Sequence, residues 1–213
     1  MKTKITNAIF SLFLRVLLKY GVDKANSHVI KIICADLFRY TGIYDQKLIA
    51  REAISNPGFR FTLFLRICEA KPKSMLRKRI HAFSYFFHRK YFLEYGYQIP
   101  VGTKIGRGFQ ILHFGHIIFN PNVIIGENCT IFPGVTIGQD KNGLTPKIGD
   151  KVWIGSNSVI AGGGGVNIGN NVLIAPGSLV NFDVPDNSLV IGNPGKYVIK
   201  SERIIEGYLN NMI

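Results

Sequence analysis

The residues of this 213-residue chain that could do chemistry are its five histidines and three cysteines. A histidine titrates near neutral pH and can act as a general base, whereas clustered histidines or cysteines would indicate a metal site. Cys34, Cys68 and Cys129 lie far apart among apolar neighbours. We therefore expect three buried thiols in a reducing cytoplasm, without a disulfide framework or a zinc site. No histidine lies near carboxylates at a metal-binding spacing, so no metal is predicted.

Two of the histidines, His113 and His116, lie three residues apart at a break in a sequence repeat. The other three, His28, His81 and His88, fall in segments that we expect to be helical. We predict that these three side chains lie on helix surfaces. The repeat that His113 and His116 interrupt is therefore the element to define first.

From residue 98 onward, an apolar residue recurs every six positions within each uninterrupted stretch, often followed by glycine. A period of six fits neither a helix nor an ordinary strand, but it fits a short strand followed by a tight corner. Three such strands make a triangular coil of about eighteen residues, and stacked coils bury a column of aliphatic side chains. The twelve positions in the frame are Ile105, Ile111, Phe119, Ile125, Ile131, Ile137, Ile148, Ile154, Ile160, Ile168, Ile174 and Val180.

Three insertions interrupt this frame, at residues 113–116, 139–145 and 162–165. A regular solenoid offers no pocket, so insertions mark where such a fold usually carries its function. The run of four glycines at 162–165 lacks the Lys-Ser/Thr that follows a phosphate-binding loop, and we interpret it as a bulge.

Residues 98–196 resemble the serine acetyltransferase-like branch of the hexapeptide-repeat acetyltransferases. The matching stretches are "TKIGRGFQILHFGHIIF", "VIIGENCTIFPGVTIG", "PKIGDKVWIGSNSVI" and "DVPDNSLVIGNPGKYV". Upstream, "ADLFRYTG" and "NPGFRFTLFLRICEA" are similar to the helical N-terminal segments of relatives encoded among surface-polysaccharide enzymes. The repeat and the resemblance together imply a mainly β protein: an α-helical N-terminal region (1–97), a left-handed parallel β-helix (98–196) and a C-terminal tail (197–213). We expect residues 205–213 to form a short closing helix after the last coil.

The resemblance also implies a homotrimer that binds acetyl-CoA in a groove between adjacent β-helices. A histidine of the family acts as general base on the acceptor hydroxyl, and His113 matches that position. His116 is the rival, expected at the rim of the site. The matching coenzyme positions are Gly138, Ser156 and Pro176, through backbone, and Lys196, through its charge on a phosphate. Trp153 is expected to pack against a neighbouring subunit or the coenzyme.

The chain departs from the serine acetyltransferases at two places that concern the acceptor. Gln98 replaces an aspartate that orients the catalytic histidine, and Leu144 and Thr145 replace an Arg-His pair of the serine pocket. A serine carboxylate would lose its cationic partner there, whereas a neutral sugar needs none. We therefore expect an O-acetyltransferase acting on a hydroxyl of a bacterial surface polysaccharide, such as capsule or O-antigen, or its precursor. The alternatives are a serine O-acetyltransferase of cysteine biosynthesis and an inactive trimeric scaffold.

Most of the positive charge lies in the N-terminal half. Residues 1–97 contain 18 Lys and Arg against 6 Asp and Glu, a net charge of +12, while residues 98–213 contain 8 against 7, a net charge of +1.

Residues 4–20 predict an amphipathic helix that packs on its own domain or lies in a membrane interface. Residues 75–95 interleave basic and aromatic residues, which suits an anionic lipid surface; no nucleic-acid module accompanies them, so nucleic acid is not expected. The expected location is the cytoplasm, with peripheral attachment to the inner face of the membrane as a further possibility.

Overall fold

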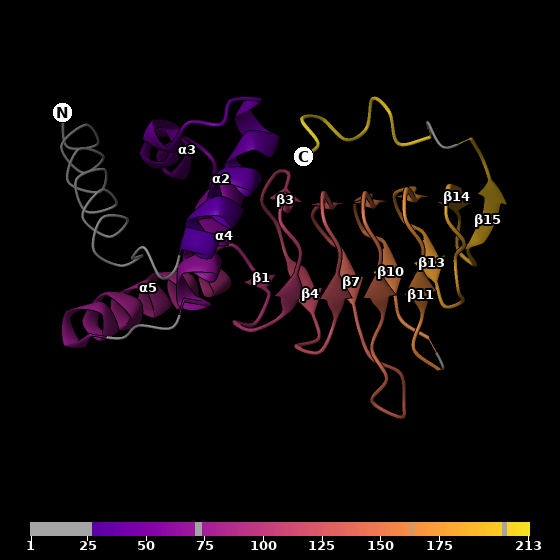
Figure 1. Ribbon diagram of the computed structural model, residues 1–213. Coiled ribbons are helices and arrows are strands. Elements are labelled where there is room, and N and C mark those ends of the chain that lie inside the picture. The colour runs from indigo at the N-terminus through magenta and orange to yellow at the C-terminus, as the bar shows by residue number, and fades with distance from the viewer. Residues whose placement is uncertain (1–26, 71–73, 163, 202–203) are drawn as a thin grey trace.

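A bundle of helices is followed by a three-sided stack of short strands in this computed structural model (Figure 1). The structure describes residues 27–70, 74–162, 164–201 and 204–213. The helix predicted over 4–20 lies outside the described residues. In the described part, α5 ends at Glu94 and the first strand begins at Tyr97.

The helix over Pro57–Cys68, which packs on the strands, has a clear start signal. The side chain of Asn56 accepts hydrogen bonds from the backbone N–H groups of Gly58 and Phe59, and Pro57 occupies the first turn of the following helix. This combination caps and starts a helix. None of the helices that the structure describes is long and apolar enough to cross a membrane. The elements are α2 (Ser27–Thr41), the 3-10 helix η2 (Gln46–Leu48), α3 (Ile49–Ser55), α4 (Pro57–Cys68) and α5 (Met75–Glu94).

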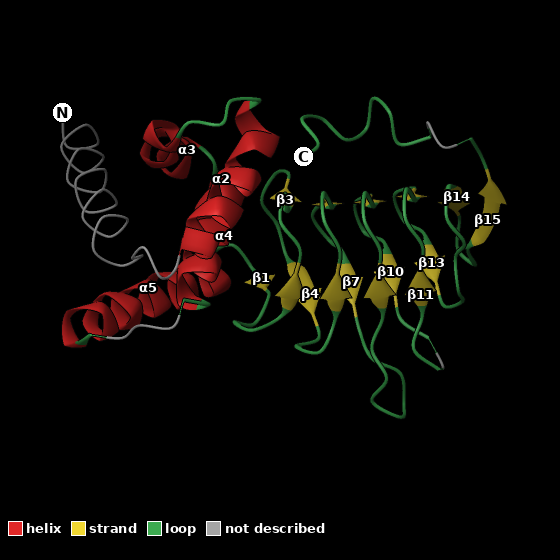
Figure 2. Cartoon of the chain, in the orientation of Figure 1, coloured by secondary structure: helices red, strands yellow, loops and turns green. Residues whose placement is uncertain are grey.

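The strands form three sheets that make the sides of the stack (Figure 2). Sheet A contains β1 (Tyr97–Gln98), β4 (Ile117–Phe119), β7 (Thr136–Ile137), β10 (Val159–Ile160) and β13 (Leu179–Val180). Sheet B contains β2 (Lys104–Ile105), β5 (Ile124–Ile125), β8 (Lys147–Ile148) and β11 (Asn167–Ile168). Sheet C contains β3 (Gln110–Ile111), β6 (Thr130–Ile131), β9 (Trp153–Ile154), β12 (Leu173–Ile174), β14 (Ser188–Ile191) and β15 (Lys196–Ile199).

The six-residue frame of the sequence is the register of these sheets. Ile111 pairs with Ile131, and Ile131 with Ile154, in parallel strands, and all twelve positions of the frame are buried. Each buried aliphatic side chain contributes about 1.5–3 kcal/mol to folding. The prediction of a hexapeptide-repeat parallel solenoid after a helical region is therefore confirmed. Among the strands that the structure describes, β15 alone runs antiparallel; it pairs with β14 and begins at residue 196, where the boundary was expected.

Three corners connect the sheets, and each gathers equivalent residues of successive coils. The C–A corner contains residues 112–116, 132–135, 155–158 and 175–178. The A–B corner contains residues 120–123, 138–146, 161–166 and 181–183, and the B–C corner contains residues 106–109, 126–129, 149–152 and 169–172. The insertion at 113–116 therefore lies at the C–A corner, and the other two lie at the A–B corner.

Helices α2 and α4 cover the first coil and satisfy its backbone groups with buried charges. The Asp36 carboxylate lies 2.9 Å from Arg66 Nε and accepts the backbone N–H of Phe109. The Arg66 guanidinium donates to the carbonyl oxygens of Ile105 and Gly106. Burial alone would lower the pKa of Arg66, but the adjacent Asp36 carboxylate outweighs it and the net shift of that pKa is upward. Burial raises the pKa of Asp36, and the Arg66 charge and the Phe109 N–H act against that rise.

The first turn of α4 lies directly against β3, the strand that leads into the insertion at 113–116. A Cβ atom on Gly58 would come within 2.2 Å of the Ile111 carbonyl oxygen, so only glycine permits this approach. The Tyr40 hydroxyl accepts the Ile111 N–H at 2.9 Å and lies 3.1 Å from the Ile111 carbonyl oxygen. The helices thus contact β3 through both backbone polar groups of Ile111.

The C-terminal residues 204–213, here called the C-terminal strap, run back from β15 along the coils toward α2 (Figure 1). Ile205 and Leu209 pack on Leu173. Arg39 Nε donates to the Asn210 carbonyl oxygen at 2.8 Å. The helix predicted over 205–213 is wrong: these residues form turns, because Gly207 adopts φ 86°, a left-handed conformation that a right-handed helix does not use.

The surface position predicted for His88 is also wrong. This side chain is 4% exposed, its ring lies 5.0 Å from that of Phe61, and its Nε2 lies 3.2 Å from the Ile99 carbonyl oxygen. Burial lowers the pKa of His88 from 6.5 to about 4, against the hydrogen bond to Ile99, with help from the nearby Arg89 charge. Helical periodicity could not locate this face, because α5 carries aromatic residues all around. All three cysteines are buried thiols, as predicted.

The depressed pKa of His88 predicts a loss of stability in acid. Between pH 6.5 and about 4 the unfolded chain binds a proton at this position and the folded chain does not. The free energy of unfolding should therefore fall by up to roughly 3 kcal/mol as the pH drops through this window. Urea unfolding of the wild type and of His88→Gln at several pH values measures the effect. An equally steep fall in both proteins would contradict the assignment.

Candidate active site

His113 lies at the C–A corner of the first coil, two residues after the end of β3, and its side chain is exposed. Its backbone adopts φ 62°, a left-handed conformation that is uncommon for residues other than glycine. Such conformations persist only where the surroundings hold them, and they gather at functional sites. His116 is also exposed, three residues on, directly before β4. The structure therefore brings the two histidines to one corner, and only His113 has the unusual backbone.

Tyr97 is the residue that holds His113, and the sequence analysis missed it. The Tyr97 hydroxyl donates a hydrogen bond of 2.7 Å to the His113 carbonyl oxygen, and the side chain is 0% exposed. Burial raises the pKa of Tyr97, so the hydroxyl keeps its proton and remains a donor. The rings of Phe61 and Tyr95 meet the Tyr97 ring edge-on at 5.2 and 5.6 Å. A buried, well-packed hydroxyl therefore fixes the backbone that carries the histidine.

Gln98 does not take the role that the resemblance suggested for its position. Its side chain is exposed in β1, and in the described part of the chain no hydrogen bond joins it to His113. A change of one position along β1 moves a side chain from the outer to the inner side of the sheet. Support for His113 thus comes from the inside of the coil, through Tyr97, and acts on its backbone.

Aromatic side chains surround His113 on its outer side. Phe114 is 69% exposed, and the ring of Phe132 in the next coil lies 5.9 Å from the His113 ring. Trp153 packs on Phe132 at 4.7 Å and on Tyr208 of the C-terminal strap at 5.6 Å. Within one chain, Trp153 therefore packs on the strap, while its expected contact with a subunit or coenzyme stays a prediction. The six-residue frame gave no signal for Phe132 or Trp153, because it reports only the inward-facing positions of each coil.

The expected coenzyme positions fall into three places. Register puts Ser156 and Pro176 two residues after Ile154 and Ile174, as His113 is after Ile111, so all three occupy equivalent positions of the C–A corner. Gly138 lies at the A–B corner, at the other end of the sheet A strands. Lys196 is exposed in β15, beyond the last coil. One chain thus gathers His113, Ser156 and Pro176 along one edge, and these coenzyme roles stay predictions.

The insertion at 139–145 is an ordered loop organised by Asp140. One carboxylate oxygen accepts the N–H groups of Asn142 and Leu144, and the other accepts the N–H of Gly164, each at 2.8 Å. These backbone hydrogen bonds, led by that of Gly164, lower the pKa of Asp140. The two A–B insertions are therefore tied together. Leu144 and Thr145 lie in this loop, away from the His113 corner of the same chain.

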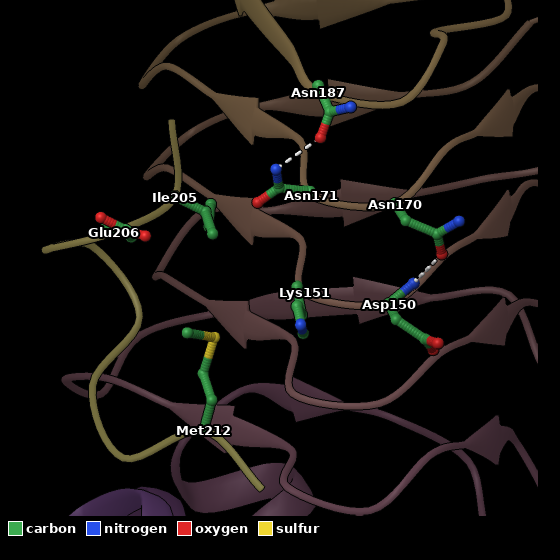
Figure 3. Close-up of a pocket in the computed structure, with 8 residues that line it drawn as sticks. All are labelled: Asp150, Lys151, Asn170, Asn171, Asn187, Ile205, Glu206 and Met212. Carbon is green, nitrogen blue, oxygen red and sulfur yellow. Dashed lines mark hydrogen bonds between the residues drawn. The ribbon is translucent and has the colours of Figure 1, made fainter. Parts of the chain in front are cut away.

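An open cavity of about 540 Å³ lies at the B–C corner, under the C-terminal strap (Figure 3). Amide and charged side chains of the corner, such as Lys151 and Asn187, face Ile205, Glu206 and Met212 of the strap. None of the sequence-predicted site residues lines it. In the residues that the structure describes, no group of three histidine, cysteine or acidic side chains is arranged to hold a metal ion.

The geometry around His113 predicts a measurable role for the Tyr97 hydroxyl. Tyr97→Phe should lower kcat for the acyl transfer expected from the sequence about five- to tenfold, because a lost hydrogen bond of about 1 kcal/mol lets the corner leave the conformation seen here. The acceptor KM should stay unchanged. Tyr95→Phe is the matched control, since its hydroxyl contacts Arg60 instead of His113. Steady-state kinetics decide, and a rise in KM with unchanged kcat would count against a positioning role.

Known acetyltransferases share sequence with about half of this chain. No family model matches the chain. Over 119 residues it is 35% identical to a serine acetyltransferase of Bacillus licheniformis, covering 54% of each chain. Over 104 residues it is 41% identical to the putative colanic acid biosynthesis acetyltransferase WcaB of Escherichia coli K12, covering 48% of this chain and 63% of that protein. The chain thus spans about half the length of the serine acetyltransferases that it matches.

Solved structures extend the likeness to most of the chain. The crystal structure of Neisseria gonorrhoeae serine acetyltransferase in complex with serine is 28% identical, with a TM-score of 0.61, over 81% of this chain and 70% of that one. A serine acetyltransferase in complex with CoA has a TM-score of 0.65 at 20% identity, over 87% and 75% of the two chains, and shows the shared fold. The resemblance to the serine acetyltransferase-like branch of the hexapeptide-repeat acetyltransferases is therefore confirmed.

Proposed function

We propose that this chain is an acetyl-CoA-dependent O-acetyltransferase whose acceptor is a hydroxyl of a bacterial surface polysaccharide or its precursor. The observation that carries the proposal is His113, exposed at the corner that also holds Ser156 and Pro176. The relative named for colanic acid biosynthesis, at 41% identity, supports the choice of a saccharide acceptor. The serine acetyltransferase in complex with CoA supports the choice of coenzyme.

The reaction proposed for this corner is direct acyl transfer. A neutral His113 imidazole takes the proton of the acceptor hydroxyl as its oxygen attacks the thioester carbonyl. The tetrahedral intermediate then collapses, the carbon–sulfur bond breaks, and the imidazolium returns its proton to the departing thiolate. The products are an acetyl ester and the free thiol of CoA, so atoms and protons balance. Backbone N–H groups at the corner would stabilise the oxyanion.

The corner suits an extended thioester arm. Ser156 and Pro176 belong to successive coils, about 4.8 Å apart along the stack, so a linear group can pass one corner per coil. Lys196 is exposed farther along the same direction, where a lysine can meet a phosphate as a point charge. Gly138 lies at the A–B corner and can reach the same groove only from a neighbouring copy.

We propose a homotrimer for the same reason. Ile118 and Val159 point outward from sheet A and are 38% and 37% exposed, so this face has an apolar surface for another copy to cover. Sheet A lies between the corner of His113 and the corner of Gly138, so packing through it would bring the two corners of neighbouring copies together. Light scattering after gel filtration measures the assembly, and a monomer of unchanged activity would contradict the proposal.

A screen of acceptors with acetyl-CoA, read by thiol release and by NMR of the product, tests the function. Acetylation of a saccharide hydroxyl is expected. The serine acetyltransferases among the relatives support a second candidate acceptor, L-serine. Thiol release with L-serine at a rate above that of every saccharide would establish that alternative. Absence of transfer to either class would favour an inactive scaffold.

The basic and aromatic face of α5 supports peripheral attachment to the inner face of the membrane. Phe83 and Phe86 are 46% and 61% exposed, and Arg79, Arg89 and Lys90 are exposed on the same helix. Rings that enter the lipid boundary beside cations that meet anionic headgroups suit such a surface. Flotation with anionic vesicles at low and high salt tests this. Binding should be lost at high salt and in Phe86→Ser, and an absence of lipid binding at low salt would refute it.

A further inference from the structure

Three aromatic side chains continue from His113: Phe132 at the C–A corner, Trp153 in β9 of sheet C, and Tyr208 in the C-terminal strap. Phe132, Trp153 and Tyr208 follow one another, with ring centroids 4.7 and 5.6 Å apart, and the His113 ring lies 5.9 Å from Phe132. We call Phe132, Trp153 and Tyr208 the aromatic row. Neighbouring rings are tilted by 52° and 68°, so the row presents several short faces instead of one flat surface.

Each side chain of the aromatic row is partly exposed, so a ligand can contact it. Phe132 and Trp153 are half-buried, and Tyr208 is 52% exposed. Large aromatic side chains left open in a row are unusual, because burying them in the core would stabilise the fold more. Their chain positions are far apart: two come from successive coils and the third from the C-terminal strap. The strap therefore completes a surface that the solenoid alone would lack.

Beyond Phe132, the aromatic row runs in a different direction from the C–A corner, along which the thioester arm is proposed to lie. Ser156 and Pro176 continue from His113 along the C–A corner, whereas Trp153 begins β9 at the far end of the sheet C strands. Two lines of residues therefore begin at His113. One follows the C–A corner through Ser156 and Pro176, and the other follows the aromatic row across sheet C to the C-terminal strap.

We propose that the aromatic row is the acceptor subsite and that it binds several consecutive sugar units of a saccharide chain. A pyranose ring has an apolar face of C–H bonds that stacks on an aromatic ring, while its hydroxyl groups stay in water at the edges. Each step of the row is about as long as one sugar unit with its glycosidic oxygen. A chain lying on the row would present its last unit to His113. This inference rests on the proposed function and names the substrate contact within it.

The subsite has a consequence that separates it from an amino-acid site. Affinity should rise with the number of sugar units until the row is covered, because each ring adds a contact. A small acceptor such as L-serine would touch none of the rings beyond Phe132. Chain-length dependence is therefore the expected signature.

Binding can be measured apart from catalysis, because Trp153 is the single tryptophan of the chain and its fluorescence reports on the row directly. The full chain, without acetyl-CoA, is applied to a glycan array of bacterial surface oligosaccharides of one to six units, and hits are titrated by fluorescence. We expect binding that strengthens with length. Phe132→Leu and Tyr208→Leu should each weaken it about tenfold or more. Tyr197→Leu, an exposed tyrosine on β15 outside the row, is the matched control and should bind as the wild type does.

The outcomes separate this inference from the proposed function. Glycan binding that depends on the row in a protein without transferase activity would keep the subsite and refute the function. Transfer to saccharides with equal affinity in Tyr208→Leu and wild type would refute the subsite alone. Weaker acetyl-CoA binding in the row variants would assign the row to the coenzyme, and a changed oligomeric state would assign it to a subunit interface. Either result, or the absence of any glycan binding, overturns the inference.

Discussion

Replacement of His113 by asparagine is expected to reduce acetyl transfer about 10²- to 10⁴-fold, the usual contribution of a general base. Asparagine is the informative choice because it tolerates the left-handed conformation that His113 adopts at φ 62°. Alanine at this position would add backbone strain to the loss of the imidazole. The exposed side chain makes no core contact, so thermal stability and oligomeric state should stay those of the wild type.

His116 provides the matched control for this experiment. It is exposed at the same corner and lies three residues away. His116→Asn should retain most of the activity, as measured by kcat/KM of the wild type, His113→Asn and His116→Asn side by side. Full activity in His113→Asn would remove the general-base role, and a severe loss in His116→Asn alone would transfer the role to that residue.

Removal of the Arg66 charge is expected to have the largest effect on stability. Arg66→Met leaves the Asp36 carboxylate buried at 1% exposure without its cation, and it removes donors from the carbonyl oxygens of Ile105 and Gly106. Breaking a buried pair from one side costs about 3–5 kcal/mol. Activity should fall with it, because α2 and α4 hold the coil on which His113 stands.

The double variant Asp36→Asn/Arg66→Met should be more stable than the sum of the two single effects predicts, since the lone buried charge is then gone. Arg107 and Glu127 form an exposed pair near the same coil, with side chains 55% and 42% exposed. Arg107→Ala should cost less than about 1 kcal/mol. Urea unfolding at matched protein concentration compares the wild type with Arg66→Met, Asp36→Asn, the double variant and Arg107→Ala. An Arg66→Met variant no less stable than Arg107→Ala would show that the buried pair does not fasten the helices.

Much of the fold was predictable because it repeats. An inward aliphatic residue every sixth position reports the coil directly, so the register of Ile111, Ile131 and Ile154 could be derived before any coordinates. The break in this period located both His113 and His116, and the resemblance to the acetyltransferase family singled out His113. The irregular parts carried no such signal: the turns of the C-terminal strap depend on Gly207, and the burial of His88 depends on which aromatic face of α5 meets α4.

The sequence by itself thus determined the solenoid and its breaks, because these follow from local spacing, and its resemblance to a known family pointed to the candidate base at one of the breaks. Only the tertiary structure decided how the base is held and what lies beside it. The Tyr97 hydroxyl reaches the His113 carbonyl because successive coils stack, and Tyr208 reaches Trp153 because the strap folds back over sheet C. These contacts join residues 16 and 55 positions apart, and no local pattern specifies such pairs. They depend on packing, which also turns the break at His113 into a candidate active site.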